Sequence, residues 1–584
     1  MTIKDTVART IARKADAKVG EIIGKTTTKV AEEITIPIPS DWAMGGLTSA
    51  GMETSVTNSY KSGYIDVSKV KRLRLENNTI MHRVNLYNAA KQMLRQAAFD
   101  INYYTVDDDV YFVRIVVADT SKTSYQVYTV DITTTTEPIF IPSSLKFGFM
   151  PSNDAATNAV ALQRAVDAGG TIRVEQQGLY DIDRAIKIGD NVTLDFGPGV
   201  FLRRTTSNGY VLVNKGAFTR SYNKNIVIRG LKLICNGKES TAGSELITGL
   251  RGQISFFYVK NLTIENFECL DLLSYSYCVQ ICTFEDVIID KIRVEGGKDA
   301  VHFGRGSSFV VRDGKFKTYD DPIALNGHDY DTGNPQLGWI ENGLIENCYD
   351  LAAASTTGYF LRVLAGAWVD WFSGMELQKS DTVVSNGRLY RVVANPDGTK
   401  YTSTMAPTHA SGTVTLDGNI KWAMIQDDVT YTAGCRNIHL RNIYLQKNRP
   451  VAVSIHFDKD NYSRSYYPNA TPPIQKSIIL ENIHMQADVP RLITATTPVD
   501  TIKLVNSEVM NTSIVLYNIS TTGMTYSNTN LIMMGVTFKG TGGQRLVNCT
   551  GGRTASVKII GSVVENATYV PTFSSGVTIM AKDI

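Results

Sequence analysis

A seven-residue phrase recurs along the chain from residue 225 onward and limits the possible folds more than any other feature. Each copy begins with a small or polar residue, alternates apolar and polar positions, and has an Asn, Gly or other polar residue near its end. The copies are NIVIRGL at 225, NLTIENF at 261, DVIIDKI at 286, SFVVRDG at 308, NGLIENC at 342, NIHLRNI at 437, SIILENI at 477, TIKLVNS at 501, NLIMMGV at 530 and SVKIIGS at 556. Most neighbouring copies are separated by 22 to 40 residues.

The period of the apolar positions within the phrase is two, so each copy predicts a short strand with one apolar face, and helical repeats are excluded. The Asn or Gly that follows suits a sharp bend. Short strands with polar bends, repeated at intervals of roughly 25 residues, are typical of solenoids. We therefore predict an all-β chain built on a right-handed parallel β-helix, with strands stacked about 4.8 Å apart. A helix over residues 153–168 is placed to cap its N-terminal end.

The pattern divides the rest of the chain into further segments. Residues 1–34 have the apolar spacing of a helix, which would serve oligomerisation or virion attachment. Residues 35–142 alternate like a small antiparallel β-sandwich, interrupted by one helical stretch at about 88–99. Residues 143–584 form the β-helix. Between the copies at 342 and 437, residues 374–428 carry their own strand and turn signals and predict an inserted small β module.

Composition narrows the class of partner. The formal net charge of +3 over 584 residues favours neither nucleic acid nor an anionic membrane as a partner. No apolar run is long enough to span a bilayer, and the N-terminus lacks the apolar segment of a secretory signal. The seven cysteines are scattered and predict buried thiols in a chain made in a reducing cytoplasm.

The candidate chemistry lies on three consecutive coils. Aligning YCVQICT at 277, DAVHFGR at 299, DPIALNG at 321 and YFLRVLA at 359 makes Val279, Val301, Ile323 and Leu361 point inward. The same alignment places Gln280, His302, Ala324 and Arg362 in an outward column. Asp299, Asp320 and Asp321 lie at or before their strands, about one rung of 5 Å apart. Such carboxylates can divide the general acid and base roles, because like charges push their pKa values apart.

The segment GKDAVHF, followed after 21 residues by DDPIALN, resembles the polygalacturonase pattern in which an Asp precedes an Asp-Asp pair by one coil. That resemblance implies catalytic roles for Asp299, Asp320 and Asp321. The match is partial, since His302 stands where that family has a further Asp, and its Gly-His-Gly and Arg-Ile-Lys phrases are absent. Substrate recognition is therefore expected to differ from that of a pectin-degrading enzyme.

The whole chain resembles phage tailspikes that degrade bacterial surface polysaccharides. The entry phrase NDAATNAVALQRAVDAGGTIRVEQQGLYDI and the repeats carry this resemblance, and the segment from 45 to 117 is similar to small jelly-roll modules of phage tail proteins. The resemblance implies a homotrimer in the virion tail that contacts other tail proteins through its N-terminus and cleaves a capsular or O-antigen polysaccharide. We expect no cofactor and no membrane insertion.

Further residues are candidates for substrate binding. They are Arg362, His328, Arg305, Trp368, Trp371 and Tyr359. Trp368 and Trp371 would form either a sugar-stacking platform or the hydrophobic seat of the inserted module. The inserted module resembles small phage modules often taken to bind carbohydrate, and its Tyr390 and Trp422 would either stack on sugars or form its core. Asp329 and Asp331 offer too few ligands to predict a calcium site.

Three alternatives to a phage tailspike hydrolase remain open at this point. A polysaccharide lyase would use His302 or a tyrosine as base and a cation such as Arg362 to neutralise a uronate. A receptor-binding tail protein would bind glycan without cleaving it. A secreted bacterial pectinase is less consistent with the N-terminal segments and the lack of a signal sequence.

Overall fold

The chain divides into two compact units, Glu21–Ile141 and the part from Pro142 onward. The computed structural model describes residues 34–38, 41–44, 46–47, 52–55, 59–68, 72–75, 81–97, 103–106, 109–118, 125–131, 143–353, 357–540, 545–566 and 569–584. Apart from Ile34, which begins a strand, the helix predicted over residues 1–34 lies outside the described residues.

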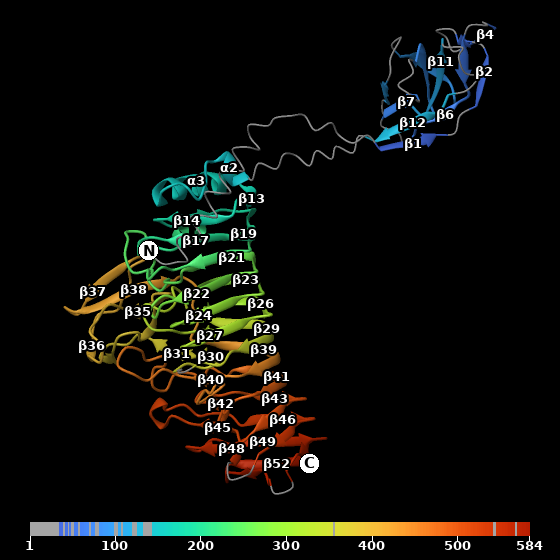
Figure 1. Ribbon diagram of the computed structural model, residues 1–584. Coiled ribbons are helices and arrows are strands. Elements are labelled where there is room, and N and C mark those ends of the chain that lie inside the picture. Colours follow the sequence, from blue (N-terminus) through green and yellow to red (C-terminus); the bar gives the residue numbers. More distant parts are fainter. Residues whose placement is uncertain are drawn as a thin grey trace. The chain divides into compact units, whose positions relative to one another are not determined.

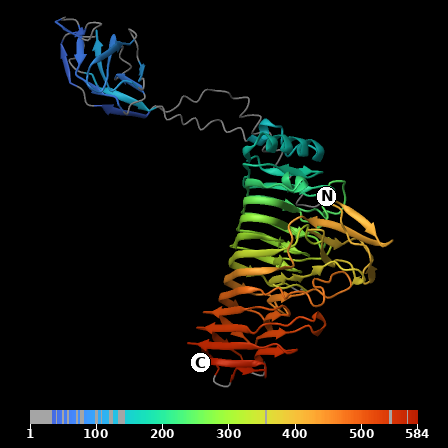
Figure 2. The same cartoon turned by 180° about the vertical axis from the view of Figure 1, so that it is seen from behind.

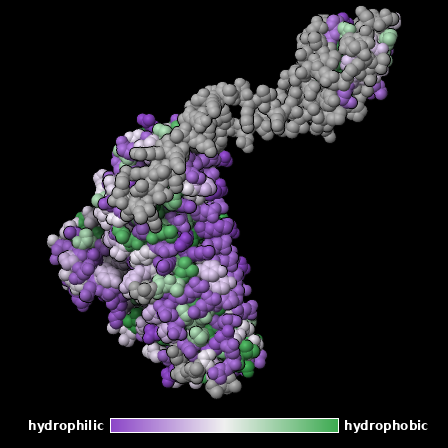
Figure 3. Space-filling model, viewed as in Figure 1, coloured by the Kyte–Doolittle hydropathy of each residue, from purple (hydrophilic) through white to green (hydrophobic). Residues whose placement is uncertain are grey.

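The larger unit is a parallel β-helix, as predicted. Its strands form one continuous sheet from β13 (Gly170–Val174) to β52 (Val577–Lys582), in which strands of successive coils pair in parallel (Figure 1). The short strand β31 (Gly366–Ala367) pairs antiparallel with β39 (Thr432–Leu445). Aliphatic side chains of the repeated phrase, such as Ile226, Ile228 and Leu262, are buried in one long core. Hydrophilic residues predominate on the face of this unit seen in Figure 3.

The bends between strands explain the polar residue near the end of each phrase. The sixth residue of every copy has a left-handed backbone, with φ between 47° and 71°, at Gly230, Asn266, Lys291, Asp313, Asn347, Asn442, Asn482, Asn506, Gly535 and Gly561. Gly and Asn adopt this conformation at the least cost. Stacked bends also bond to one another, since the Asn442 side-chain amide donates to Asn347 over 2.8 Å. The predicted role of these residues in bending the chain is confirmed.

Helix α3 (Ala155–Ala168) lies at the N-terminal end of the β-helix, where the sequence predicts a cap. The Asp154 carboxylate accepts a hydrogen bond from the Thr157 backbone N–H over 2.7 Å and begins the helix. Gly169, with φ of 74°, ends it. Leu162 and Val166 join the core of the first coil and close it against water.

The inserted module projects from one side of the β-helix, and both views agree on this placement (Figures 1 and 2). Its five-stranded sheet consists of β32 (Val369–Asp370), β34 (Thr382–Ser385), β35 (Arg388–Val392), β38 (Ile420–Gln426) and β37 (Thr413–Leu416). Strands β33 (Met375–Leu377) and β36 (Tyr401–Ser403) pair beside it. Tyr390 and Trp422 are fully buried in its core, so the sugar-stacking role considered for them is wrong.

The smaller unit is a β-sandwich in its described part. One sheet orders β1 (Ile34–Ile38), β12 (Val127–Asp131), β7 (Arg72–Leu75) and β10 (Tyr103–Thr105). The other contains β2 (Trp42–Met44), β5 (Tyr60–Ser62), β6 (Ile65–Asp66), β11 (Phe112–Val117), β8 (Arg83–Tyr87) and β9 (Met93–Gln96). The helix predicted at about 88–99 is wrong, because β9 pairs antiparallel with β8 there.

None of the helices in the described part of the chain combines the length and apolar character needed to cross a lipid bilayer.

Candidate active site

The predicted column of side chains exists in register. Gln280 on β23 (Val279–Asp290), His302 on β25 (Val301–Phe303), Ala324 on β28 (Ile323–Asn326) and Arg362 on β30 (Leu361–Leu364) stand side by side on consecutive coils. The column points outward from the coils, as the alignment predicts, but it is largely closed to solvent. The segment from 327 to 337 covers it, with the Gly333 carbonyl accepting a hydrogen bond from Gln280 over 2.7 Å.

Three carboxylates meet beside this column. One oxygen of each of Asp299, Asp320 and Asp321 lies within 4.8 Å of the others. Asp299 precedes β25, and Asp320 and Asp321 precede β28, so the coil geometry alone brings them together. Asp299 and Asp321 are buried, whereas the Asp320 side chain is 22% exposed. Asp320 is therefore the member that solvent or a substrate reaches first.

The surroundings shift the pKa values of two of these carboxylates in opposite directions. Burial raises the pKa of Asp321 well above its usual range, and the charges of Asp320 and Asp299 raise it further. Burial also opposes ionisation of Asp299, but the Lys298 ammonium and His302 outweigh it and hold that pKa at about 2. The cluster thus holds two carboxyl groups whose pKa values are pushed apart, the arrangement that divides acid and base roles.

Lys298 holds the remaining carboxylate. Its ammonium forms an ion pair with Asp320 and lies 3.6 Å from Asp299. Burial disfavours the charged lysine, but these two aspartates raise its pKa. Sequence reasoning missed Lys298, although it sits inside the GKDAVHF phrase next to Asp299.

His302 is fixed between two carboxylates. Its Nδ1 lies 2.9 Å from Asp299 and its Nε2 lies 3.1 Å from Asp329. The Tyr277 ring stacks on the imidazole with centroids 3.8 Å apart and planes at 14°. Asp329 also accepts from the Asn326 amide over 2.8 Å, which aims its carboxylate at His302. His302 is therefore held rigidly and contacts the cluster through Asp299.

Two arginines flank the cluster, of which Arg251 is buried and Arg362 is half-buried. Arg251 donates to the Tyr277 hydroxyl over 2.7 Å, and its guanidinium lies 4.8 Å from the centroid of the Tyr275 ring. Arg362 pairs with Asp458 over 3.1 Å. The sequence offered no signal for Arg251 or Asp458, because they reach the site from coils outside the quoted segment.

Several buried polar atoms here have no hydrogen-bond partner among the described residues. They include Oδ2 of Asp321, Nε of Arg362 and Oδ2 of Asp458. Buried polar atoms are nearly always bonded in native proteins, so their concentration in one place indicates a site that binds water or a substrate. Partly exposed tyrosines surround it, with Tyr319 (43% exposed) next to Asp320 and Tyr275 against Arg251.

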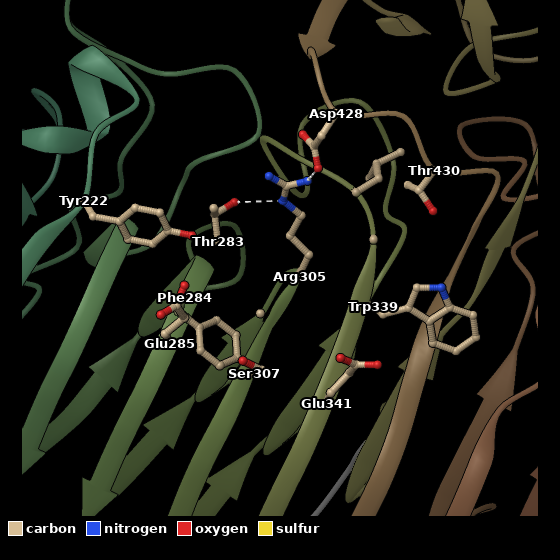
Figure 4. A pocket seen from close by; sticks show the side chains of 13 residues that line it. Tyr222, Thr283, Phe284, Glu285, Arg305, Ser307, Trp339, Glu341, Asp428 and Thr430 are labelled. Carbon is tan, nitrogen blue, oxygen red and sulfur yellow. Dashed lines mark hydrogen bonds and ion pairs between the residues drawn. The ribbon is translucent and has the colours of Figure 1, made fainter. Parts of the chain in front are cut away.

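The other predicted binding residues lie in different places. Tyr359 borders the cluster, and its backbone N–H donates to Asp321 over 2.7 Å. His328 is buried beneath the inserted module, 6.1 Å from the Trp368 ring. Arg305 pairs with Asp428 and lines a separate cavity (Figure 4).

The sugar platform considered for Trp368 and Trp371 is wrong, and the alternative role as the seat of the module is what the structure shows. Trp368 is 1% exposed and packs with module residues such as Val384 and Leu389. Trp371 packs against the module core and donates to the Ser403 hydroxyl over 2.9 Å. Neither ring presents a free face beside the carboxylates.

Two groups of side chains in the described part of the chain have the spacing of a metal site. Asp299, Asp320 and Asp321 have the spacing of a cation site, but the Lys298 ammonium already supplies positive charge to two of them. A second group joins Cys235, Cys269 and Asp271, where both Asp271 oxygens accept backbone N–H groups. Asp329 and Asp331 point to different partners, His302 and the Ala394 backbone N–H, and do not converge on one ion.

Comparison with known proteins gave structural matches only: no protein-family model matches the chain, and no curated protein does. The A-module of a mannuronan C-5 epimerase of Azotobacter vinelandii is 12% identical, with a TM-score of 0.43 over 75% of this chain and 99% of that one. A family 28 exopolygalacturonase of Yersinia enterocolitica is 10% identical, with a TM-score of 0.36 over 89% of this chain and 98% of that one. The N-terminal fragment of gene product 12 of bacteriophage phi29 is 13% identical, with a TM-score of 0.36 over 75% of this chain and 70% of that one. Since these TM-scores lie below 0.5, the function of this chain must be judged from its own side chains.

Proposed function

We propose that this protein is a glycosidase that cleaves a bacterial surface polysaccharide. The observation that carries the proposal is the carboxylate cluster, in which Asp321, with its raised pKa, lies beside Asp299, with its lowered pKa, and the partly exposed Asp320. Glycosidic hydrolysis needs one carboxylic acid to protonate the leaving oxygen and one carboxylate to act from the other side.

The environment of each residue suggests its role. Asp321, whose pKa is raised by burial, acts as the general acid. Asp320, which pairs with Lys298, acts as the base or nucleophile. Asp299 and His302 hold the geometry, and Arg362 offers an unpartnered Nε to a hydroxyl or carboxylate of the substrate. The tyrosines at the rim, Tyr275 and Tyr319, would stack on sugar rings.

A second candidate, a lyase acting on a uronate-containing glycan, is favoured by three cations around the site. Arg251, Lys298 and Arg362 would neutralise a uronate carboxylate, and His302 or Tyr277 would remove the α-proton. Hydrolysis is preferred because one of its carboxylates, Asp320, is accessible, whereas neither candidate lyase base, Tyr277 or His302, is exposed.

The test is digestion of a panel of purified capsular and O-antigen polysaccharides, followed by product mass and near-ultraviolet absorbance. Hydrolysis adds one water per cleavage and creates no absorbance, whereas a lyase creates an unsaturated, absorbing sugar. An Asp320→Asn protein that clears host capsule as well as the wild type would show that the cluster does not cleave glycan. Tight binding without any cleavage would point instead to a receptor-binding protein.

The setting we propose is a phage tail, with the protein acting as a homotrimeric tailspike at the host cell surface. Support comes from the order of the chain, in which a small β-sandwich unit precedes the β-helix. Light scattering of the full chain would give the trimer mass, and a monomer under all conditions would contradict this assembly.

A further inference from the structure

A second concave site lies on the larger unit, separate from the carboxylate cluster. A cavity of about 350 Å³ opens between the outer face of the β-helix and the end of the inserted module (Figure 4). Tyr222, Arg305, Trp339 and the carboxylates Glu285, Glu341 and Asp428 are among its lining. It shares no lining residue with the carboxylate cluster.

The cavity runs along the β-helix axis. Four of the lining residues each come one position before a residue that pairs in register with the neighbouring coil. They are Tyr222 before β19 (Asn223–Arg229), Thr283 on β23, Arg305 before β26 (Gly306–Arg312) and Trp339, which opens β29 (Trp339–Asp350). Tyr222 and Trp339 are four rungs apart, or roughly 19 Å at about 4.8 Å per rung. In Figure 4 the two aromatic rings lie on opposite sides of Arg305. The shape suits an elongated ligand.

The charges in this cavity are already paired. Glu285 binds Lys260 over 2.7 Å, Glu341 binds Arg436 over 3.0 Å, and Arg305 binds Asp428. A charged ligand would have to break one of these pairs. A neutral ligand rich in hydroxyl groups would donate to the carboxylates and accept from Arg305 without doing so.

The aromatic rings are held for stacking. The Arg436 guanidinium lies 3.7 Å from the Trp339 ring centroid and the Lys260 ammonium 4.4 Å from that of Tyr222. Both rings are half-buried and reach the cavity. Flat aromatic surface beside polar groups is the combination that binds a sugar ring, with its apolar face and rim of hydroxyls.

The floor of the cavity is rigid. Thr283 has φ of 52°, a left-handed conformation that is strained for a β-branched residue. Its hydroxyl donates to Gln336 over 2.6 Å and accepts from Arg305 over 3.2 Å, and Gln336 also donates to Tyr258 over 2.9 Å. Strain of this kind collects at functional sites, and here it fixes Arg305 between the two rings.

We propose that this cavity, which we call the axial groove, is a second glycan-binding site for a linear, uncharged stretch of polysaccharide. It would hold the polymer on the same coils that carry Asp299 and Asp320, and so keep the chain bound between cleavage events. The binding part of this inference does not depend on the proposed cleavage.

The test uses full-length Trp339→Ala, with Trp339→Phe as the conservative variant and Phe372→Ala as a matched control on an exposed ring of the inserted module. Each is made in an Asp320→Asn background and probed on an array of neutral and acidic bacterial polysaccharides. We expect Trp339→Ala to raise the Kd for neutral glycans roughly tenfold or more, the effect of losing one well-packed contact. Trp339→Phe and Phe372→Ala should stay within about twofold of the background protein.

With Asp320 intact, Trp339→Ala should raise KM for polymer while leaving kcat, and KM for short product oligosaccharides, unchanged. Unchanged glycan affinity in Trp339→Ala, or no glycan bound by any variant, would overturn the inference. A change in oligomeric mass on light scattering would also overturn it, because the groove would then be a contact between subunits. Binding that depends on Trp339 in a protein that cleaves nothing would refute the proposed function and leave the axial groove standing.

Discussion

At the scale of single residues, burial decides what Asp321 can do. Three carboxylates lie within 4.8 Å of one another, and burial together with the charges of the other two raises the pKa of Asp321. The neighbouring Lys298 pairs with Asp320 and lies 3.6 Å from Asp299, so its positive charge is shared between these two carboxylates.

Asp321→Asn tests this assignment. We expect kcat to fall by about 10²–10⁴-fold, the usual contribution of a general acid. Because Asp321 must carry its proton and its pKa is raised, wild-type activity should be lost as pH rises through that pKa. Residual activity of the variant should lack this basic limb in a pH–rate profile. Asp313→Asn, at a bend that tolerates Asn, is the matched control, and a basic limb that persists in Asp321→Asn would refute the role.

His328 makes stability depend on pH. Burial and, to a smaller extent, the charge of Arg391 lower its pKa to about 4. The unfolded chain takes up this proton near pH 6.5 and the folded chain only near 4, so stability should fall as the pH drops between these values. The loss is about 3 kcal/mol. Calorimetry at pH 7 and pH 4.5 should show a smaller drop in Tm for His328→Gln than for wild type.

The control for that measurement is His484→Gln, whose imidazole stacks on Tyr444 at the surface of the β-helix. It should keep the wild-type pH dependence. Identical drops in Tm for wild type and His328→Gln would mean that other groups govern acid stability.

At the scale of the element, each coil is adjusted to its neighbour. The phrase NGLIENC has Gly343 where the other copies have Ile, Leu, Val or Phe. Phe309, in the phrase one coil earlier, pairs in register with Gly343 and fills its space. A Cβ added at Gly343 would lie 2.1 Å from the Phe309 ring. The exception in the repeat is therefore a compensation within the core.

A double-mutant cycle checks this compensation. Gly343→Val alone should overpack the core and destabilise the β-helix by about 1–3 kcal/mol. Phe309→Val alone should leave a void and also destabilise. The double variant restores two ordinary phrases, so its loss should be smaller than the sum of the single losses in chemical denaturation. Additive losses would show that the two side chains do not share the space.

At the scale of the whole molecule, the inserted module is hydrogen-bonded to the segment that covers the candidate site. Arg391 on β35 is buried and donates to the backbone carbonyls of Asp331 (3.0 Å) and Asn334 (2.8 Å). These residues belong to the segment that covers His302 and carries Asp329. The module lies between two repeat copies that are 95 residues apart in sequence, and it thus fixes the roof of the candidate site.

Arg391→Met should free this roof. We expect faster hydrogen exchange over 326–337 and a loss of activity of roughly tenfold or more, because small displacements of catalytic groups are costly. Arg388→Met lies on the same strand, where Arg388 pairs with the exposed Asp427, and should leave both measurements near wild type. Unchanged exchange in Arg391→Met would show that the segment is held without the module.

The sequence by itself determined the β-helix and most of the carboxylate cluster. Both follow from local order, since alternation defines the strands, left-handed residues such as Asn347 and Asn442 define the bends, and an interval of 21 residues puts Asp299 next to Asp320.

Only the tertiary structure decided which groups complete the site. Arg251 and Asp329 belong to the site, whereas Trp368 packs beneath the inserted module. The place of each side chain depends on which loop or module covers which coil. Covering contacts join segments far apart in sequence and are determined by shape and burial, which no periodic pattern along the chain records.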